Sequence, residues 1–156
     1  MPFHKILVPV DFSECSQAAL TLAIELARRD GATLEVVHVH EPPYAVGHVT
    51  VQVPGMGEIA MVDYMEAQAR KLLEESLADH PLDDLVITRT LLAGLPEKVL
   101  VDHARAGGHD LLVMGTHGRR GFSRVLMGSV TERVLRHAPA PVLVVRDHYQ
   151  DEHARA

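Results

Sequence analysis

Short apolar runs alternate with amphipathic segments along this chain. The runs are rich in valine, leucine and isoleucine, which is typical of strands buried in a parallel sheet. One of them, over residues 85–92, alternates polar with apolar residues, so we expect that strand to lie nearer a sheet edge. The five predicted strands cover residues 5–10, 33–40, 85–92, 110–114 and 141–145.

Helical periodicity fills most of the sequence between these runs. In the first helical segment, small and apolar residues recur at steps of three and four, with Ser13 as the expected N-cap and Gly31 as the expected C-cap. Pro81 ends a second, longer helix. The predicted helices cover residues 14–30, 58–80, 95–106 and 129–137.

The segment over residues 41–57 breaks this alternation. It contains three prolines and three glycines among small and apolar residues, so no regular helix is expected there. Because it follows a predicted strand, where α/β proteins place their binding loops, we expect it to be a binding loop.

Strands that alternate with helices predict an α/β fold, in which one open, mainly parallel five-stranded sheet carries helices on both faces. Ligands of such folds bind outside the carboxyl ends of the strands, where the strand order reverses. Asp11, residues 39–41 and Gly115 all lie at such ends, so we expect them on one rim. The 156 residues are the size of a single domain, assigned to residues 3–146 with a polar tail over 147–156.

The connection between the fourth strand and the last helix is rich in glycine and arginine. Glycines let the backbone approach a ligand closely, and a helix N-terminus favours an anion. Together with the arginines, they predict a site for the phosphate chain of a nucleotide. The glycines are Gly115, Gly118, Gly121 and Gly128; the arginines are Arg119, Arg120 and Arg124; the helix begins at Ser129.

Charge is distributed unevenly around this connection. The whole chain has a net charge of −6, whereas residues 115–146 hold six arginines against one acid, a local charge of +5 that leaves −11 for the remainder. An acidic surface disfavours nonspecific nucleic-acid binding. We assign Arg119 and Arg120 to phosphate contact, and Arg133 and Arg136 to a solvated helix face.

The spacing of Gly115, two residues, Gly118, nine residues and then Gly128-Ser129 resembles the ATP-binding pattern of the universal stress protein family. Residues 6–13 and 141–145 are also similar to the first and last strands of that family. The resemblance covers residues 3–146 and is weakest over 42–57. It implies a Rossmann-like adenine-nucleotide-binding fold and an ATP-binding protein with a stress-response or regulatory role.

The resemblance also assigns roles to residues of this chain. The segment Pro9-Val10-Asp11 would lie against the adenosine, and the backbone of Val39 would read the adenine edge. In the alternative interpretation, Asp11 and Ser129 only cap helices, while Gly115 and Gly118 only form a tight turn. The predicted binding residues are Pro9, Val10, Asp11, Val39, Gly115, Thr116, His117, Gly118, Arg119, Arg120, Gly121, Gly128, Ser129, Val130 and Thr131.

The expected cofactor is ATP, with any Mg²⁺ bound by its phosphates and several waters. No catalytic residues and no metal ligands are predicted. The chain contains eleven histidines, but none forms a zinc-ligand cluster with its single cysteine. That cysteine, Cys15, is expected to be a small buried residue.

Two other functions compete with an ATP-binding regulatory module. A slow ATP-hydrolysing enzyme is disfavoured because the chain lacks a Gly-x-x-x-x-Gly-Lys-Ser/Thr motif and an evident general base or set of metal-binding carboxylates. A dimerisation module with a vestigial site is disfavoured because the glycine pattern is intact. A dinucleotide enzyme is poorly supported, since the glycine spacing differs from that of such sites.

Partners and location follow from the same sequence. The single cysteine, the lack of a signal peptide and the absence of an apolar run near ~20 residues predict a cytoplasmic protein without membrane insertion. Residues 141–145 read as an edge strand, and the family resemblance implies a homodimer through it. A regulatory protein partner of unknown identity is expected, and nucleic acid is not.

Overall fold

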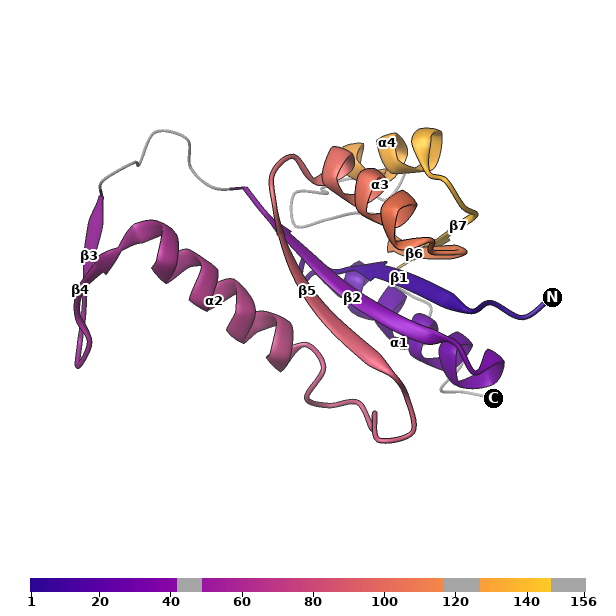
Figure 1. The fold of residues 1–156 in the computed structure, drawn as a ribbon, viewed down its shortest axis with the longest axis horizontal. Helices are drawn as coiled ribbons and strands as arrows, with labels where there is room; N and C mark the ends of the chain where they lie inside the picture. Colours follow the sequence, from indigo (N-terminus) through magenta and orange to yellow (C-terminus); the bar gives the residue numbers. More distant parts are fainter. Residues whose placement is uncertain (42–48, 117–126, 147–156) are drawn as a thin grey trace.

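A five-stranded, entirely parallel sheet forms the centre of the protein (Figure 1). The computed structural model describes residues 1–41, 49–116 and 127–146. The strand order β5-β2-β1-β6-β7 places β5 and β7 at the sheet edges, as predicted. The strands are β1 (Lys5–Pro9), β2 (Thr33–His40), β5 (Ile87–Ala93), β6 (Leu111–Gly115) and β7 (Val142–Val145).

Helices cover both faces of the sheet, which confirms the predicted α/β fold (Figure 1). The side chains of each central strand alternate between the two hydrophobic cores. On β2, for example, Leu34 and Val36 face α1 and α2, whereas Val37 faces α3 and α4. The helices are α1 (Glu14–Asp30), α2 (Met61–Glu75), α3 (Pro96–Gly107) and α4 (Ser129–His137).

The caps of α1 agree with the sequence prediction. The Ser13 hydroxyl accepts a hydrogen bond from the Ser16 amide, and the C-cap Gly31 adopts a left-handed φ of 67°. A β-carbon is strained in that conformation, so glycine suits this position. Both ends of α1 are therefore determined by local chemistry.

The prediction of a helix over residues 58–80 was wrong at both ends. An antiparallel hairpin, β3 (Thr50–Val53) and β4 (Gly57–Ala60), precedes α2, which begins at Met61 and ends at Glu75. The turn has a physical cause, because Gly55 and Gly57 both adopt a φ of 82°. This left-handed conformation favours a tight hairpin turn and is incompatible with the start of an α-helix at these residues. Residues 42–48 lie outside the described part of the chain.

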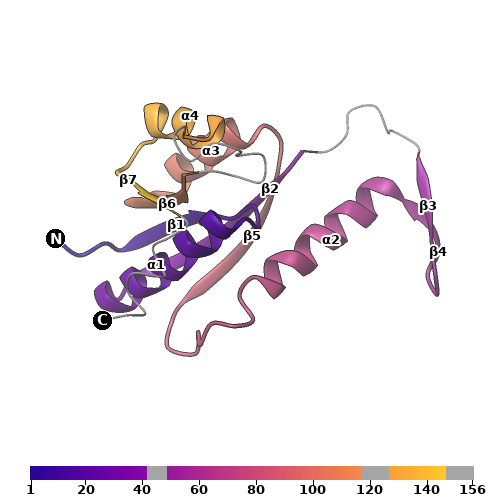
Figure 2. The same cartoon turned by 180° about the vertical axis from the view of Figure 1, so that it is seen from behind.

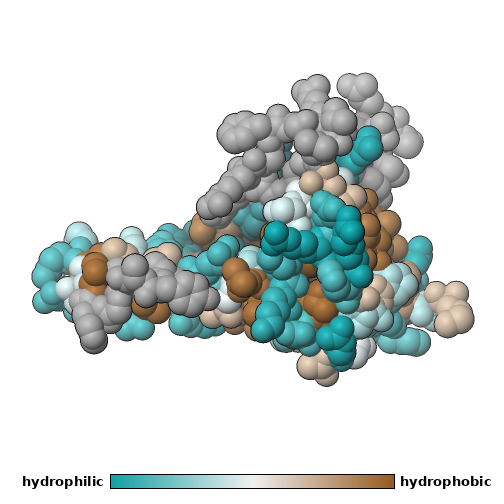
Figure 3. All heavy atoms as spheres, turned by 90° about the horizontal axis from the view of Figure 1, so that it is seen from above, coloured by the Kyte–Doolittle hydropathy of each residue, from teal (hydrophilic) through white to brown (hydrophobic). Residues whose placement is uncertain are grey.

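The hairpin and the first half of α2 extend away from the sheet (Figures 1 and 2). Seen from above, they form an arm to one side of the molecule (Figure 3). Only the second half of α2 packs on the core, through Ala69 and Leu73. The first half of α2 therefore has a face that does not pack on the core and lies toward the carboxyl edge of the sheet.

None of the helices in the described ranges is both long enough and apolar enough to cross a membrane.

Candidate functional site

A cavity of about 1110 Å³ opens at the carboxyl edge of the sheet. Its walls come from the ends of β1, β2 and β6, from the N-terminal parts of α3 and α4, and from one face of α2. The strand order reverses at β1, which is where ligands bind in open α/β sheets. Of the predicted binding residues, the cavity wall includes Pro9, Val10, Asp11, Val39, Gly115, Gly128, Ser129, Val130 and Thr131.

The two ends of the glycine-rich segment meet at this cavity. The Gly128 amide donates a hydrogen bond of 2.7 Å to the carbonyl of Thr116. The Thr131 hydroxyl donates one of 2.9 Å to the carbonyl of Gly115. The N-terminus of α4 is thereby held beside the end of β6. The predicted binding residues between them, namely His117, Gly118, Arg119, Arg120 and Gly121, lie outside the described residues.

Gly115 has a packing role that is independent of any ligand. A β-carbon built at this position would lie 2.8 Å from the backbone carbonyl carbon of Cys15, at the start of α1. Real β-carbons do not approach backbone atoms so closely, so only glycine lets α1 pack against the end of β6. Cys15 itself is buried, with 7% of its surface exposed, as predicted.

The turn between β1 and α1 uses Asp11 in its local structure. An Asp11 carboxylate oxygen accepts hydrogen bonds from the Ser13 amide, at 3.1 Å, and from the Ser13 hydroxyl. Asp11 therefore stabilises the turn before α1, whereas the N-cap of that helix is Ser13. Asp11 also lies in the cavity wall, so the geometry permits both roles for this residue.

Two aromatic rings join the ends of β1 and β2 beside the cavity. The Phe12 ring lies 4.5 Å from the His38 ring, centroid to centroid, and His38 Nδ1 lies 2.7 Å from the Val10 carbonyl, to which it donates. Phe12 adopts a φ of 66°, which is strained for an aromatic residue and often marks a functional site. Sequence reasoning missed this pair, although both residues directly adjoin predicted binding residues.

Charge in the cavity wall is mixed. Arg133, on the first turns of α4, forms an ion pair with Glu97 on α3. The pKa of the Glu97 carboxyl lies below its ordinary value, because the carboxylate accepts a hydrogen bond from its own amide and another from Arg133. Arg136 pairs with Glu132 on the exposed side of α4, as the solvated-face assignment expects. The Arg133 side chain is also solvated, with 62% of its surface exposed, and its ion pair in addition connects two helices at the cavity.

One wall of the cavity comes from α2, which the sequence analysis did not include in the site. Tyr64, Met65, Gln68 and Leu72 follow one another at steps of one, three and four along this helix and line the cavity. Met65 and Leu72 are each more than a third exposed. Of the apolar residues on this helix, Met65 and Leu72 thus face the cavity, whereas Leu73 packs in the core.

A cavity between the carboxyl edge of a parallel sheet and a helix N-terminus is the place where open α/β folds bind their ligands. The chain belongs to the universal stress protein family, whose model matches residues 2–146.

Individual relatives agree with this membership. The universal stress protein YxiE of Bacillus subtilis is 31% identical over 148 residues, covering 92% of this chain and 99% of the relative. The structure of UspA from Lactobacillus plantarum superposes with a TM-score of 0.76 at 29% identity, covering 94% and 99% of the two chains. A universal stress protein from Archaeoglobus fulgidus in complex with dAMP gives 0.62 at 26% identity, covering 93% and 99%.

The close contact at Gly115 predicts a stability effect in the absence of any ligand. Gly115→Ala would force α1 away from β6, and overpacking of this kind costs about 1–3 kcal/mol. Urea unfolding of the ligand-free variant should show that loss of free energy. A value within about 0.5 kcal/mol of wild type, the range of ordinary surface substitutions, would contradict the packing role.

Proposed function

We propose that this protein binds an adenine nucleotide, ATP, in the cavity at the carboxyl edge and acts as a stress-response or regulatory module. One observation carries the proposal: the hydrogen bonds from Gly128 and Thr131 hold the N-terminus of α4 against the end of β6. The first-turn amides of a helix have no acceptor within the helix and favour a phosphate.

Family membership supports an adenine nucleotide as the ligand. The related protein from Archaeoglobus fulgidus is described in complex with dAMP. In the proposed arrangement, adenosine lies against the Pro9–Asp11 segment and the backbone of Val39, where the Phe12 and His38 rings also line the cavity. The size of the cavity, about 1110 Å³, is sufficient for a nucleotide.

The phosphates would extend toward α4. Ser129 is available for this contact by its position at the first helical residue, whereas the Thr131 hydroxyl already donates to the Gly115 carbonyl. The spacing of the glycine-rich segment adds Gly118, Arg119 and Arg120 to the proposed phosphate contacts. Mg²⁺ would accompany the phosphates and retain several waters.

Substitution of Gly128 tests the position of the phosphates. Its φ of −62° and ψ of 145° suit any residue, so Gly128→Val should fold normally. The added branched side chain would crowd the amides of α4 and weaken ATP binding at least tenfold, or about 1.4 kcal/mol. Calorimetric titration with ATP, ADP, AMP and cyclic AMP measures this loss and identifies the preferred nucleotide.

Adenosine is the matched control, because it lacks phosphates and should bind Gly128→Val and wild type equally. The site assignment fails if ATP affinity is unchanged in the folded variant. The nucleotide proposal itself fails if wild type binds none of the four nucleotides and if mass spectrometry finds no nucleotide released from the purified protein.

ATP hydrolysis is the competing function of a different class. We expect ATP to act as an effector, with turnover far below the ~10 s⁻¹ typical of enzymes. The basis is that the Asp11 carboxylate, which lies in the cavity wall, is hydrogen-bonded into the β1–α1 turn and is poorly placed to act as a base. Steady-state phosphate release measures the rate. Turnover at the level of typical enzymes would show that the protein is an ATP-hydrolysing enzyme and would contradict the regulatory role.

We propose further that two chains pair through β7. The carbonyls of Pro141 and Val145 accept hydrogen bonds from Leu112 and Thr116 on the β6 side. In a parallel ladder alternate residues bond to the same neighbour, so the backbone groups of Val144 point away from β6. An exposed strand edge of this kind favours pairing with another chain, here a second copy in antiparallel orientation.

Val144→Pro would remove an outward-facing amide while preserving the bonds between β7 and β6, so we expect monomers. Val144→Thr keeps the amide and the branched shape and should remain dimeric. Light scattering at micromolar concentration distinguishes the two states. A monomeric wild type, or a Val144→Pro variant that stays dimeric, would rule out this interface.

The remaining proposals rest on the sequence and on family membership. They are a domain over residues 3–146, a cytoplasmic location and a regulatory protein as the downstream partner.

A further inference from the structure

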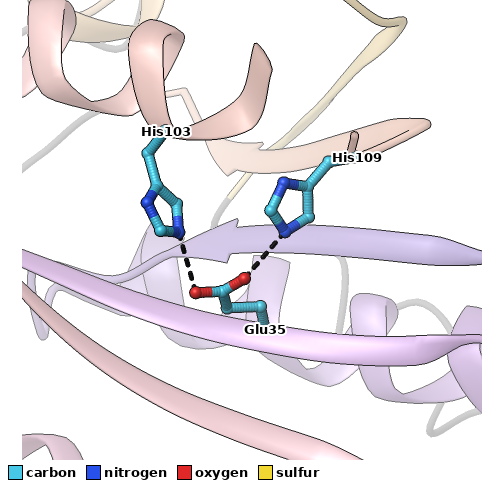
Figure 4. Close-up of side chains that lie close together, drawn as sticks. All are labelled: Glu35, His103 and His109. Atoms are coloured by element: carbon cyan, nitrogen blue, oxygen red, sulfur yellow. Dashed lines mark hydrogen bonds and ion pairs between the residues drawn. The ribbon is translucent and has the colours of Figure 1, made fainter. Parts of the chain in front are cut away.

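Three side chains from distant parts of the sequence converge between β2 and α3 (Figure 4). Nε2 of His103 lies 2.8 Å from one carboxylate oxygen of Glu35, and Nε2 of His109 lies 2.9 Å from the other. The hydroxyl of Thr90 on β5 also donates to Glu35, at 2.6 Å. Two imidazole nitrogens and a carboxylate therefore meet within 4.8 Å of one another, separate from the nucleotide cavity.

Glu35 is an unusual residue for its position. It stands in the middle of an apolar strand that is covered on both faces, and only 8% of its surface is exposed. Burial alone raises the pKa of the Glu35 carboxyl, but hydrogen bonds from Thr90 and His103 outweigh burial and hold the pKa below its ordinary value. Both carboxylate oxygens of Glu35 thus have polar partners in a position where an unpaired charge would be costly.

The ring of His109 is held in place by the two residues before it. Gly108 ends α3 in a left-handed conformation with φ of 65°, which turns the chain back toward the sheet. Gly107 lacks a β-carbon, and one built there would lie 2.5 Å from Cε1 of His109. The Gly107-Gly108-His109 sequence thus places a fully buried imidazole over Glu35.

Each ring nitrogen of His109 faces an oxygen atom. Its Nδ1 lies 3.4 Å from the carbonyl oxygen of Ala104, while its Nε2 faces the Glu35 carboxylate. A neutral imidazole has one N–H, so it cannot donate to both acceptors. With the proton on Nδ1, the arrangement matches metal-binding histidines, which donate their second ring nitrogen to a backbone carbonyl and present the other to a metal.

We propose that Glu35, His103 and His109 bind a divalent transition-metal ion, Zn²⁺, which connects the sheet to α3. Two histidines and one glutamate form a known set of zinc ligands. Metal–ligand distances of about 2.0–2.1 Å place tetrahedral donors about 3.3 Å apart. The nitrogen–oxygen pairs at 2.8 and 2.9 Å must therefore separate, while the two imidazole nitrogens, which face different carboxylate oxygens, turn toward one ion.

The fourth coordination position belongs to water. The His103 side chain is 27% exposed, whereas that of His109 is fully buried. Of the two histidines, only His103 therefore connects the cluster to solvent. This side gives the ion a path from solvent. The site is thus a three-ligand site with one open position, the pattern that zinc adopts where a water completes its tetrahedron.

Zinc titration of chelator-treated, nucleotide-free protein tests the proposal. We expect calorimetry to give one Zn²⁺ per chain and Co²⁺ to give the visible absorption of a tetrahedral complex. Zn²⁺ should also raise the unfolding midpoint by several degrees. Glu35→Gln and His109→Gln should each weaken binding at least a hundredfold, more than the roughly ten- to hundredfold that loss of an outer-shell partner costs.

His137→Gln is the matched control, because it removes an exposed histidine of α4 that is not part of the cluster and should leave affinity unchanged. His103→Gln keeps the test valid if either buried variant fails to fold, because His103 is partly exposed. Absence of Zn²⁺ binding by wild type would overturn the proposal and leave a hydrogen-bonded core cluster. Undiminished binding by His103→Gln would also overturn it. Neither result depends on whether ATP binds at the carboxyl edge.

Discussion

Pairing of β1 along both of its edges is the constraint on which the rest of the molecule depends. Five residue pairs join it to β2, from Lys5 opposite Thr33 to Pro9 opposite Val37, and β6 pairs with its other edge. The strands are added on both sides of β1, with β2 and β5 on one side and β6 and β7 on the other. The helical connections on the two sides therefore cover opposite faces of the sheet. The carboxyl ends of β1 and β6 consequently have no crossover above them, and the cavity lies there.

Much of this architecture could be read from the sequence because the strands are defined by local composition. Runs such as residues 5–10 and 110–114 are almost continuously apolar, which is typical of strands in a parallel sheet that is covered on both faces. The hairpin could not be read in the same way. Residues 58–60 continue the helical periodicity of α2, and the left-handed turn at Gly55 and Gly57 overrides it.

The site was predictable to the extent that it depends on backbone. Gly115, Gly128 and Ser129 stand at fixed positions relative to a strand and a helix, so their convergence follows from topology. The contribution of α2 was not predictable, since a stripe such as Met65 and Leu72 gives no indication of whether it faces a core or a cavity.

Glu35 was missed for a related reason. A single acid inside an apolar strand is a visible anomaly in the sequence, but its partners His103 and His109 are 68 and 74 residues away. Nothing local connects these residues, and only the packing of α3 on the sheet brings them together. The anomaly nevertheless points to a buried polar cluster, because an unpaired carboxylate would be too costly in that position.

The two ends of the glycine-rich segment are held together by hydrogen bonds between residues that flank it. Thr116 and Gly128 are joined directly, and Gly115 is joined to Thr131. The start of α4 is therefore held by contacts of the residues that flank the segment. The junction between β6 and α4 belongs to the scaffold, because its position depends on these two flanks.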